Sequence, residues 1–268
     1  MKTKSLSIFL FVLFVAGMNL GAAEDENENK EGEKFKYEKI GGEVPFSDVA
    51  LSLKTILIGN SMVGKSALIT KIYNNNFLEK YIPTVGFEFF YLNFKIVSDE
   101  DKPVLRYQIW DCSGQKNYRD LVKNFFQNAR VFLLAYDVTN EESFKNIENW
   151  VNGVKLHKTE KHIHFVLIGN KIDLDNNRKI TKEEGEKFAE ENGMKFVEVS
   201  AKTGVGIKDL ENILAKIIYE EFMKYKKEKE VEEEKKEEYD SESDFMMLEK
   251  PTHSSSLCDC CKKICENC

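Results

Sequence analysis

The segment Gly59-Asn60-Ser61-Met62-Val63-Gly64-Lys65-Ser66 decides the fold, because it fits the pattern G-x-x-x-x-G-K-[ST] of a phosphate-binding loop. The apolar run Lys54–Gly59 before it predicts a buried strand, and Lys65–Tyr73 after it has helical spacing. In this strand–loop–helix context, backbone N–H groups can point at phosphate oxygens. Lys65 would supply a charge for the β- and γ-phosphates, and Ser66 a hydroxyl for Mg²⁺. The loop therefore predicts a nucleoside triphosphate site.

Strand-like and helix-like segments alternate around this loop and after it, as far as Phe222. Helical spacing of apolar residues marks Ser143–Val154 and Ile207–Phe222. The alternation predicts an α/β fold with a mostly parallel six-stranded sheet and helices on both faces. Besides Lys54–Gly59, the predicted strands are Val85–Val97, Val104–Trp110, Val131–Tyr136, Ile163–Gly169 and Phe196–Val199.

Composition divides the 268-residue chain around this body. A hydrophobic content of 42% excludes a wholly disordered chain, and a net charge of −7 without a basic stripe argues against a nucleic-acid binder. The net negative charge lies in two acidic arms on either side of a near-neutral body, and we expect these arms to be disordered apart from a few further turns of the last helix. The segments are a signal-peptide-like apolar stretch (1–23), an acidic flexible linker (24–50), the α/β domain (51–222), a charged tail (223–257) and a cysteine-rich tail (258–268).

Two short motifs later in the chain favour guanine as the base. Asn170-Lys171-Ile172-Asp173 follows a predicted strand, at the sheet edge where ligands bind. A carboxylate there can accept hydrogen bonds from N1 and the 2-amino group of guanine, and adenine has neither donor. Ser200-Ala201-Lys202 follows the next strand and can offer a backbone N–H to guanine O6. An ATP-using enzyme is therefore disfavoured.

With these motifs in order, the chain resembles a small GTPase of the Ras superfamily, and more closely a Rab, from about Leu53 to Phe222. The resemblance implies a P-loop G domain that binds GTP, GDP and Mg²⁺. The nucleotide motifs that carry it are Gly59–Ser66, Thr84, Asp111–Gln115, Asn170–Asp173 and Ser200–Lys202. The Rab-like stretches are Val85–Phe89, Arg106–Trp110, Tyr118–Leu121 and Leu134–Thr139.

The resemblance also implies a role for each matching residue. Gln115 would be catalytic and orient the attacking water, and Gly114 would donate its N–H to the γ-phosphate. Ser66, Thr84 and Asp111 would hold Mg²⁺, and loss of the γ-phosphate would release the segments around Thr84 and Gly114. The other expected nucleotide-binding residues are Ser61, Met62, Val63, Gly64, Lys65, Ala67, Phe77, Tyr81, Asn170, Lys171, Asp173, Ser200, Ala201 and Lys202.

Two departures from the family pattern bear on this activity. Met62 stands where the family mostly has a small residue, so a bulky side chain near the phosphates would alter hydrolysis or the fit of a regulator. Lys116 stands where an acidic residue is usual, which bears on nucleotide exchange. Some proteins of this kind carry, in the same chain, an arginine that stabilises the transition state of GTP hydrolysis, and no arginine stands at that position here. We therefore expect slow turnover and a partner that supplies the arginine. Part of the aromatic residues is core, and the rest resembles an apolar effector patch, formed by Phe87, Phe89, Trp110 and Tyr118.

The two ends of the chain indicate different compartments. Lys2 and Lys4 before the apolar run Ile8–Val15 are typical of a signal peptide and would direct the body to the secretory pathway. A start at Met18 would delete that run. The resemblance implies instead the cytosolic face of an intracellular membrane, reached through a prenylated tail, although the cysteine spacing would also suit a small metal site. The candidates for lipidation are Cys260, Cys261, Cys265 and Cys268.

Two classes of function stay open. The first is a GTP-hydrolysing switch that recruits effectors to a membrane, in vesicle traffic, and Gln115 and Thr84 favour it. The second is a GTP-binding module with impaired hydrolysis that acts as a binding-only scaffold, or a divergent GTPase of the secretory pathway. For the first class the resemblance implies a monomeric G domain and a set of partners: an exchange factor, a GTPase-activating protein, Rab-type effectors, a prenylation escort and a dissociation inhibitor.

Overall fold

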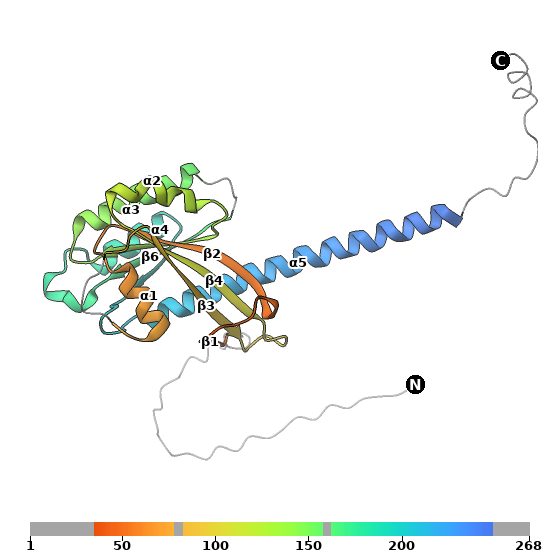
Figure 1. Cartoon of the computed structure of the whole chain (residues 1–268), viewed down its shortest axis with the longest axis horizontal. Coiled ribbons are helices and arrows are strands. Elements are labelled where there is room, and N and C mark those ends of the chain that lie inside the picture. Colours follow the sequence, from red (N-terminus) through yellow and green to blue (C-terminus); the bar gives the residue numbers. More distant parts are fainter. Residues whose placement is uncertain (1–34, 78–82, 158–161, 249–268) are drawn as a thin grey trace, which may run out of the picture. The chain divides into compact units, whose positions relative to one another are not determined.

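The computed structural model describes residues 35–77, 83–157 and 162–248. One seven-stranded sheet has the order β1-β3-β4-β2-β5-β6-β7 (Figure 1). The pairs β1–β3 and β3–β4 are antiparallel, and all other neighbours are parallel. The mostly parallel α/β sheet is therefore confirmed. The strands are β1 Tyr37–Ile40, β2 Val49–Gly59, β3 Phe87–Ile96, β4 Val104–Cys112, β5 Val131–Asp137, β6 His164–Asn170 and β7 Lys195–Glu198.

Helices cover both faces of the sheet, as predicted. Buried residues of α1 and α5 pack on one face, and buried residues of α2, α3 and α4 pack on the other. Every residue of β5 is buried, which explains why its sequence is a continuous apolar run rather than an alternating one. The helices are α1 Lys65–Asn74, α2 Arg119–Lys123, α3 Glu141–His157, α4 Lys182–Glu191 and α5 Ile207–Leu248.

Helix α4 was not predicted, although its start carries a local signal. Thr181 and Glu184 form a capping box, in which each side chain accepts a hydrogen bond from the other residue's backbone N–H. The spacing T-x-x-E before a helix is a recognised start signal. Only Gly185 and Ala189 of this helix are buried, so its apolar stripe was too thin to mark it by periodicity.

The prediction of six strands and of a linker over residues 24–50 was wrong where the structure describes it. Residues 35–48, here called the N-terminal strap, contain β1, which pairs with β3 from Tyr37↔Ile96 to Ile40↔Asn93. Lys39 Nζ donates to Glu211 Oε1 and to the carbonyl of Ile72, both at 2.6 Å. The strap therefore belongs to the folded domain. Its strand is short and charged, so the sequence pattern did not reveal it.

The strap continues along the sheet and completes the surroundings of Arg106. This arginine is buried, and its Nη2 donates to the carbonyl of Val44 at 2.5 Å while Nε donates to Asn93 Oδ1 at 2.8 Å. Its guanidinium lies 4.8 Å from the ring centre of Phe46 and 4.6 Å from that of Tyr91. Two of the four partners come from the strap, so the strap satisfies a buried cation.

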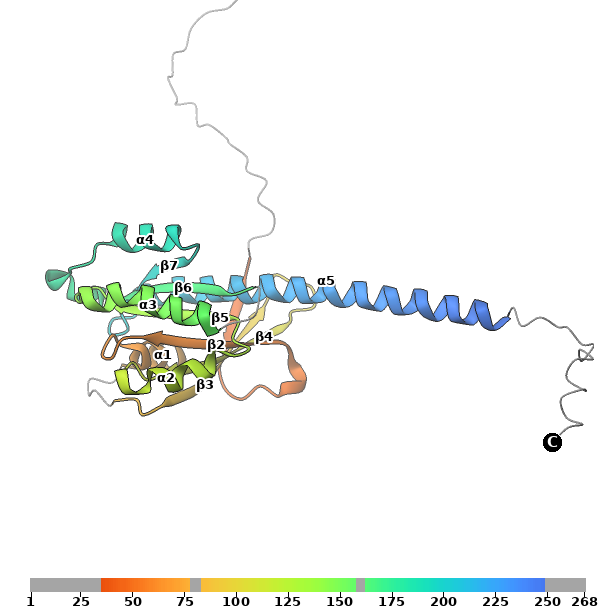
Figure 2. The same cartoon turned by 90° about the horizontal axis from the view of Figure 1, so that it is seen from above.

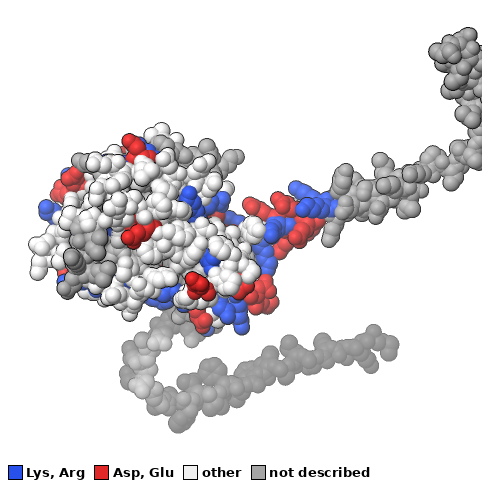
Figure 3. Space-filling view, viewed as in Figure 1, with Lys and Arg blue, Asp and Glu red and all other residues white. Residues whose placement is uncertain are grey.

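Helix α5 is longer than the sequence indicated. It has 42 residues, whereas apolar spacing predicted Ile207–Phe222 with a few further turns. Residues 227–236 are exposed, and Figure 3 shows their mixed positive and negative side chains beyond the body of the domain. Figure 2 shows the helix continuing past the strands. Lysine and glutamate at helical spacing can stabilise such a helix without a core.

Several predictions fall outside the described residues. These are the apolar segment 1–23, the first part of the linker, Tyr81, and the lipidation candidates Cys260, Cys261, Cys265 and Cys268. None of the helices in the described ranges combines the length and the hydropathy that a membrane span requires. Cys112, in β4, is buried.

Candidate nucleotide site

A cavity of about 560 Å³ lies where the parallel strands end. The phosphate-binding loop follows β2, Asp111 lies near the end of β4, and Asn170 ends β6. Parallel strands present their carboxyl ends at one sheet edge, so motifs far apart in the sequence meet there. The lining residues are Ser61, Met62, Gly64, Lys65, Ser66, Ala67, Thr70, Phe77, Thr84, Glu88, Ser113, Gly114, Gln115, Asn170, Lys171, Asp173, Leu174, Ala201 and Lys202.

The phosphate-binding loop makes close backbone contacts that require glycine. Gly64 has φ +94°, and a Cβ there would lie 2.4 Å from Asn170 Nδ2. A Cβ on Gly114 would lie 2.4 Å from the backbone N of Ser61, so the segment after β4 packs directly on the loop. These contacts hold the loop open as a cradle.

Lys65 is buried at the floor of this cradle. Its Nζ donates to the carbonyls of Gly59 at 3.1 Å and Asn60 at 2.9 Å. Burial lowers the pKa of Lys65 to about 8, although the nearby Asp111 carboxylate opposes the shift. The ammonium is thus held by neutral oxygens and keeps its attraction for an anion.

Three oxygen-bearing side chains meet beside Lys65. Ser66 Oγ donates to Asp111 Oδ2 at 2.5 Å and lies 2.9 Å from Thr84 Oγ1. Asp111 Oδ1 is buried and has no hydrogen-bond partner among the described residues. Burial raises the pKa of Asp111 to about 6, against the effects of Ser66 and Lys65. Hard oxygen donors and an unsatisfied carboxylate oxygen fit a magnesium ion.

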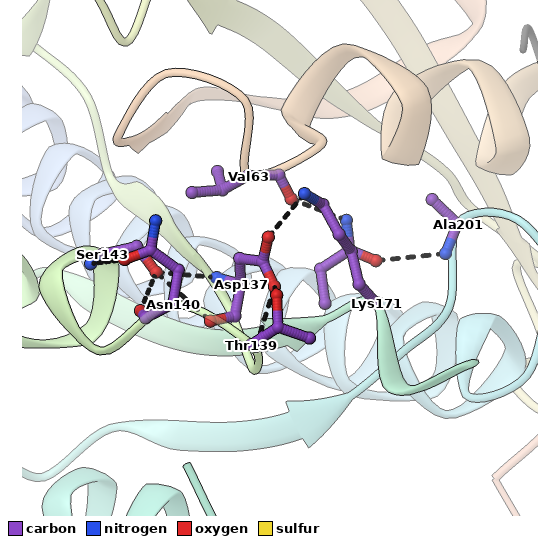
Figure 4. A network of polar contacts seen from close by, with 8 residues as sticks. Val63, Asp137, Thr139, Asn140, Ser143, Lys171 and Ala201 are labelled. Carbon is purple, nitrogen blue, oxygen red and sulfur yellow. Dashed lines mark hydrogen bonds and ion pairs between the residues drawn. The ribbon is translucent and has the colours of Figure 1, made fainter. Parts of the chain in front are cut away.

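The base-binding motifs form one rigid unit with the phosphate-binding loop. Asn170 Nδ2 donates to the carbonyl of Val63 at 2.9 Å, and its Oδ1 accepts from the N–H of Ala201 at 3.1 Å. Asp173 Oδ1 accepts from Ser200 Oγ at 2.6 Å, which fixes the carboxylate beside the cavity. Figure 4 shows the hydrogen bonds to Val63 and Ala201 together with the Lys171 side chain, which points to Asp137.

The structure brings together most of the residues predicted for the site. Among the described residues, every expected nucleotide-binding residue lines the cavity except Val63 and Ser200. These two hold lining residues in place: Val63 accepts a hydrogen bond from Asn170, and Ser200 donates one to Asp173. Gln115 and the predicted magnesium ligands Ser66 and Thr84 also line it. The sequence reasoning missed Thr70, Glu88, Ser113 and Leu174 as lining residues and Asp137 as the partner of Lys171. The sequence could have indicated these residues only through their closeness to the motifs; Leu174, for example, directly follows Asp173.

Three of the four residues of the predicted effector patch lie together. Trp110 lies 4.9 Å from Phe87 and 5.0 Å from Phe89, ring centre to ring centre, so these three aromatic residues form one cluster. The fourth member is Phe125, 5.2 Å from Trp110, and not Tyr118, which has no ring contact with Trp110 in the part of the chain that the structure describes. The turn after α2 carries Phe125 over the tryptophan.

The fold and the site together define a P-loop nucleotide-binding protein. A model of the Ras family matches residues 54–220, and the chain belongs to this family. The Rab-like resemblance is confirmed by the relatives. The chain is 36% identical to "Ras-related protein Rab-13" of Mesocricetus auratus over 165 residues, which are 62% of this chain and 79% of that protein.

Two further relatives match a similar share of the chain. The chain is 33% identical to "Ras-related protein Rab-3" of Caenorhabditis elegans over 165 residues, or 62% of this chain and 73% of that protein. It is 34% identical to "GTP-binding protein ypt2" of Schizosaccharomyces pombe over 167 residues, or 62% of this chain and 80% of that protein. The family match begins after the N-terminal strap, so the strap lies outside it.

Proposed function

We propose that the protein is a guanine-nucleotide switch that binds GTP and GDP, hydrolyses GTP slowly and recruits effectors to a membrane in vesicle traffic. One observation carries the choice of base. The Asp173 carboxylate is fixed by Ser200, and Asn170 ties the loop that carries it to the loop that carries Lys65. A guanine offers two donors to such a carboxylate, whereas adenine would leave it unpaired.

The same cavity holds residues suited to GTP hydrolysis. Gln115 lines it and would orient the attacking water, while the N–H of Gly114 would bind the γ-phosphate. Ser66, Thr84 and Asp111 would hold Mg²⁺, which neutralises charge on the phosphates when bound. No arginine is among the residues that line the cavity in the described ranges, so we expect slow intrinsic turnover and a partner that supplies the missing charge.

The position of the aromatic cluster supports a switch. Phe87 and Phe89 follow Thr84 in the chain, and Trp110 directly precedes Asp111. Thr84 and Asp111, which we propose to sense the γ-phosphate and its metal, are thus close in the chain to the aromatic residues that we propose to bind effectors. When the γ-phosphate is lost, the segments around Thr84 and Gly114 would relax and change this surface. An exchange factor and a GTPase-activating protein would control the cycle.

The membrane part of the proposal rests on the resemblance to Rabs. Prenyl groups on cysteines among Cys260, Cys261, Cys265 and Cys268 would anchor a monomeric G domain to the cytosolic face of an intracellular membrane. A prenylation escort and a dissociation inhibitor would handle the lipidated form. Intact mass of the native protein tests this directly, because prenyl groups and a start at Met1 or Met18 support it, and a lipid-free chain starting near Glu24 contradicts it.

Nucleotide binding and single-turnover hydrolysis test the core of the proposal. We expect a fluorescent GDP analogue to bind, GTP to displace it, and excess ATP to leave it in place. Asp173→Ala should weaken GDP binding by roughly 100-fold, because the guanine donors lose their acceptor. Bound GTP should be hydrolysed slowly, and Gln115→Leu should slow it further. Binding without any hydrolysis would instead support the binding-only module, for which Met62 is the candidate cause.

A further inference from the structure

Asp137, the last residue of β5, makes contacts that the proposed function does not yet use. Its side chain is only 9% exposed. Oδ1 accepts from the N–H and the Oγ1 of Thr139, at 2.8 and 2.7 Å. Oδ2 accepts from Lys171 Nζ at 2.5 Å, across from the neighbouring strand β6 (Figure 4). One carboxylate oxygen therefore serves the local turn, and the other serves only the nucleotide-binding loop.

Lys171 has a backbone conformation that needs support. Its φ is +69°, in the left-handed region that side chains other than glycine rarely adopt. The residue before it, Asn170, is held on both sides by Val63 and Ala201, and Asp173 is held by Ser200. Between these fixed points, the ion pair with Asp137 is what fixes the side chain of Lys171.

The turn after β5 has its own support, independent of the Asp137 carboxylate. The backbone N–H of Asp137 donates to Ser143 Oγ at 3.0 Å, and Ser143 Oγ donates to the carbonyl of Asn140 at 2.7 Å. A local structural role for the carboxylate would thus be limited to its bonds with Thr139. The short pair with Lys171 points toward a role at the cavity.

We propose that Asp137 is a positioning residue: it holds the Lys171 ammonium beside the guanine base and keeps the Asn170–Asp173 loop in its binding conformation. This inference rests on the proposed guanine-nucleotide function. Because both partners are largely shielded from water, neutralising one of them leaves the other poorly compensated. Lys171 would then leave its place along the base, and bound nucleotide would dissociate faster.

A double-mutant cycle tests the proposal on the full chain. The measured quantity is the dissociation rate of a fluorescent GDP analogue in Mg²⁺ buffer. Asp137→Asn should raise this rate roughly tenfold, because the charge-assisted bond is lost while the shape is kept. In a Lys171→Met background the same change should add less than a factor of two. Additive effects of the two substitutions would overturn the proposal.

Two further variants separate positioning from stability. Ser143→Ala removes the support of the turn without touching the carboxylate, so it should lower the melting temperature and leave the dissociation rate within twofold. Asp137→Glu keeps the charge but disturbs the bonds to Thr139, so it should lower the melting temperature while GDP still dissociates slowly. Dissociation from Asp137→Glu roughly tenfold faster than from the wild type would overturn the proposal, whether or not Asp137→Asn folds. A wild-type chain that binds no GDP would refute the proposed function instead.

Discussion

The two ends of the sheet are stabilised in different ways. At the nucleotide end, Lys65 and Asp111 are both buried with pKa values displaced toward their neutral forms, and one oxygen of Asp111 has no partner among the described residues. At the opposite end, the buried Arg106 donates to Asn93 and to the carbonyl of Val44, and the buried Glu221 pairs with Arg130, His164 and Lys224. The first arrangement is costly for the empty protein and suited to a charged ligand. The second stabilises the fold itself.

This comparison teaches where function is to be sought in the structure. The groups at the nucleotide end carry charges that a bound ligand and its metal would neutralise, whereas Arg106 and Glu221 find their partners within the fold. Four predictions test the contrast, from the largest expected effect to the smallest.

The largest effect is expected at Lys65. Lys65→Met should weaken GDP binding by roughly 1,000-fold, about 4 kcal/mol, since the phosphates lose a buried cation. The free energy of unfolding without nucleotide should not fall, because a neutral side chain avoids the desolvation cost that lowers the pKa of Lys65. Equilibrium titration and urea unfolding measure the two quantities. A variant that binds normally but unfolds easily would reverse the assignment of this end of the sheet.

The next effect is expected at the strap. A chain that starts at Val49 lacks Lys39, Val44 and Phe46, and we expect its free energy of unfolding to fall by about 3 kcal/mol or more. The reason is that Glu211 and Arg106 remain buried after they lose these partners. A chain that starts at Phe35 is the matched control and should unfold like the full chain. Urea unfolding at saturating GDP makes the comparison, and equal stability of the two truncations would show that the strap is dispensable.

Two positions of the phosphate-binding loop with positive φ should respond differently. Gly64→Ala should cost about 2 to 4 kcal/mol of stability, because the new methyl group meets Asn170 and φ is +94°. Met62→Gly should change stability by less than about 1 kcal/mol, since Met62 already adopts φ +66° with its side chain 66% exposed. Thermal unfolding of both variants measures this. A loss of less than about 1 kcal/mol for Gly64→Ala would mean that neither the positive φ nor the contact with Asn170 requires glycine at this position.

The smallest effect concerns pH at the strap end of the sheet. Burial alone would raise the pKa of Glu221, but hydrogen bonds from Lys224, His164 and Arg130 outweigh it and hold the pKa at about 2. A carboxyl with a lowered pKa contributes stability above its unfolded pKa, near 4.5, and loses it as pH falls toward 2. The wild type should therefore lose about 1 to 2 kcal/mol more unfolding free energy between pH 7 and pH 2 than Glu221→Gln does. This figure is reduced because one partner, Lys224, is exposed to solvent. Urea unfolding between pH 7 and pH 2 gives both curves, and parallel curves would contradict the expectation.

The sequence predicted the nucleotide end of the sheet much better than the strap end. A phosphate-binding loop, Asn170–Asp173 and Ser200–Lys202 each have a fixed chemical task, so their spacing alone placed them around one cavity. The strap has no such task. Arg106 pairs with Val44 and Asn93 through contacts between distant segments, and no local pattern reveals a buried arginine that is satisfied by carbonyls and rings.

The contacts at the site that the sequence did not reveal have similar causes. Phe125 joins the ring cluster around Trp110 because the turn after α2 carries its ring there. Asp137 was not singled out, since a carboxylate at the end of a strand has no motif of its own and acquires its partner only when β6 lies beside β5. Periodicity predicts which face a residue occupies but not which neighbour its polar atoms find.

The last part of α5 has a mechanical consequence. At 1.5 Å per residue, the helix from Lys227 to Leu248 forms a rod of roughly 33 Å, close to the hydrocarbon thickness of a bilayer. A flexible tether of the same residues would let its two ends approach each other, whereas a rod keeps them apart. A partner that binds the helix near Leu248 would therefore be held at about this distance from Lys227.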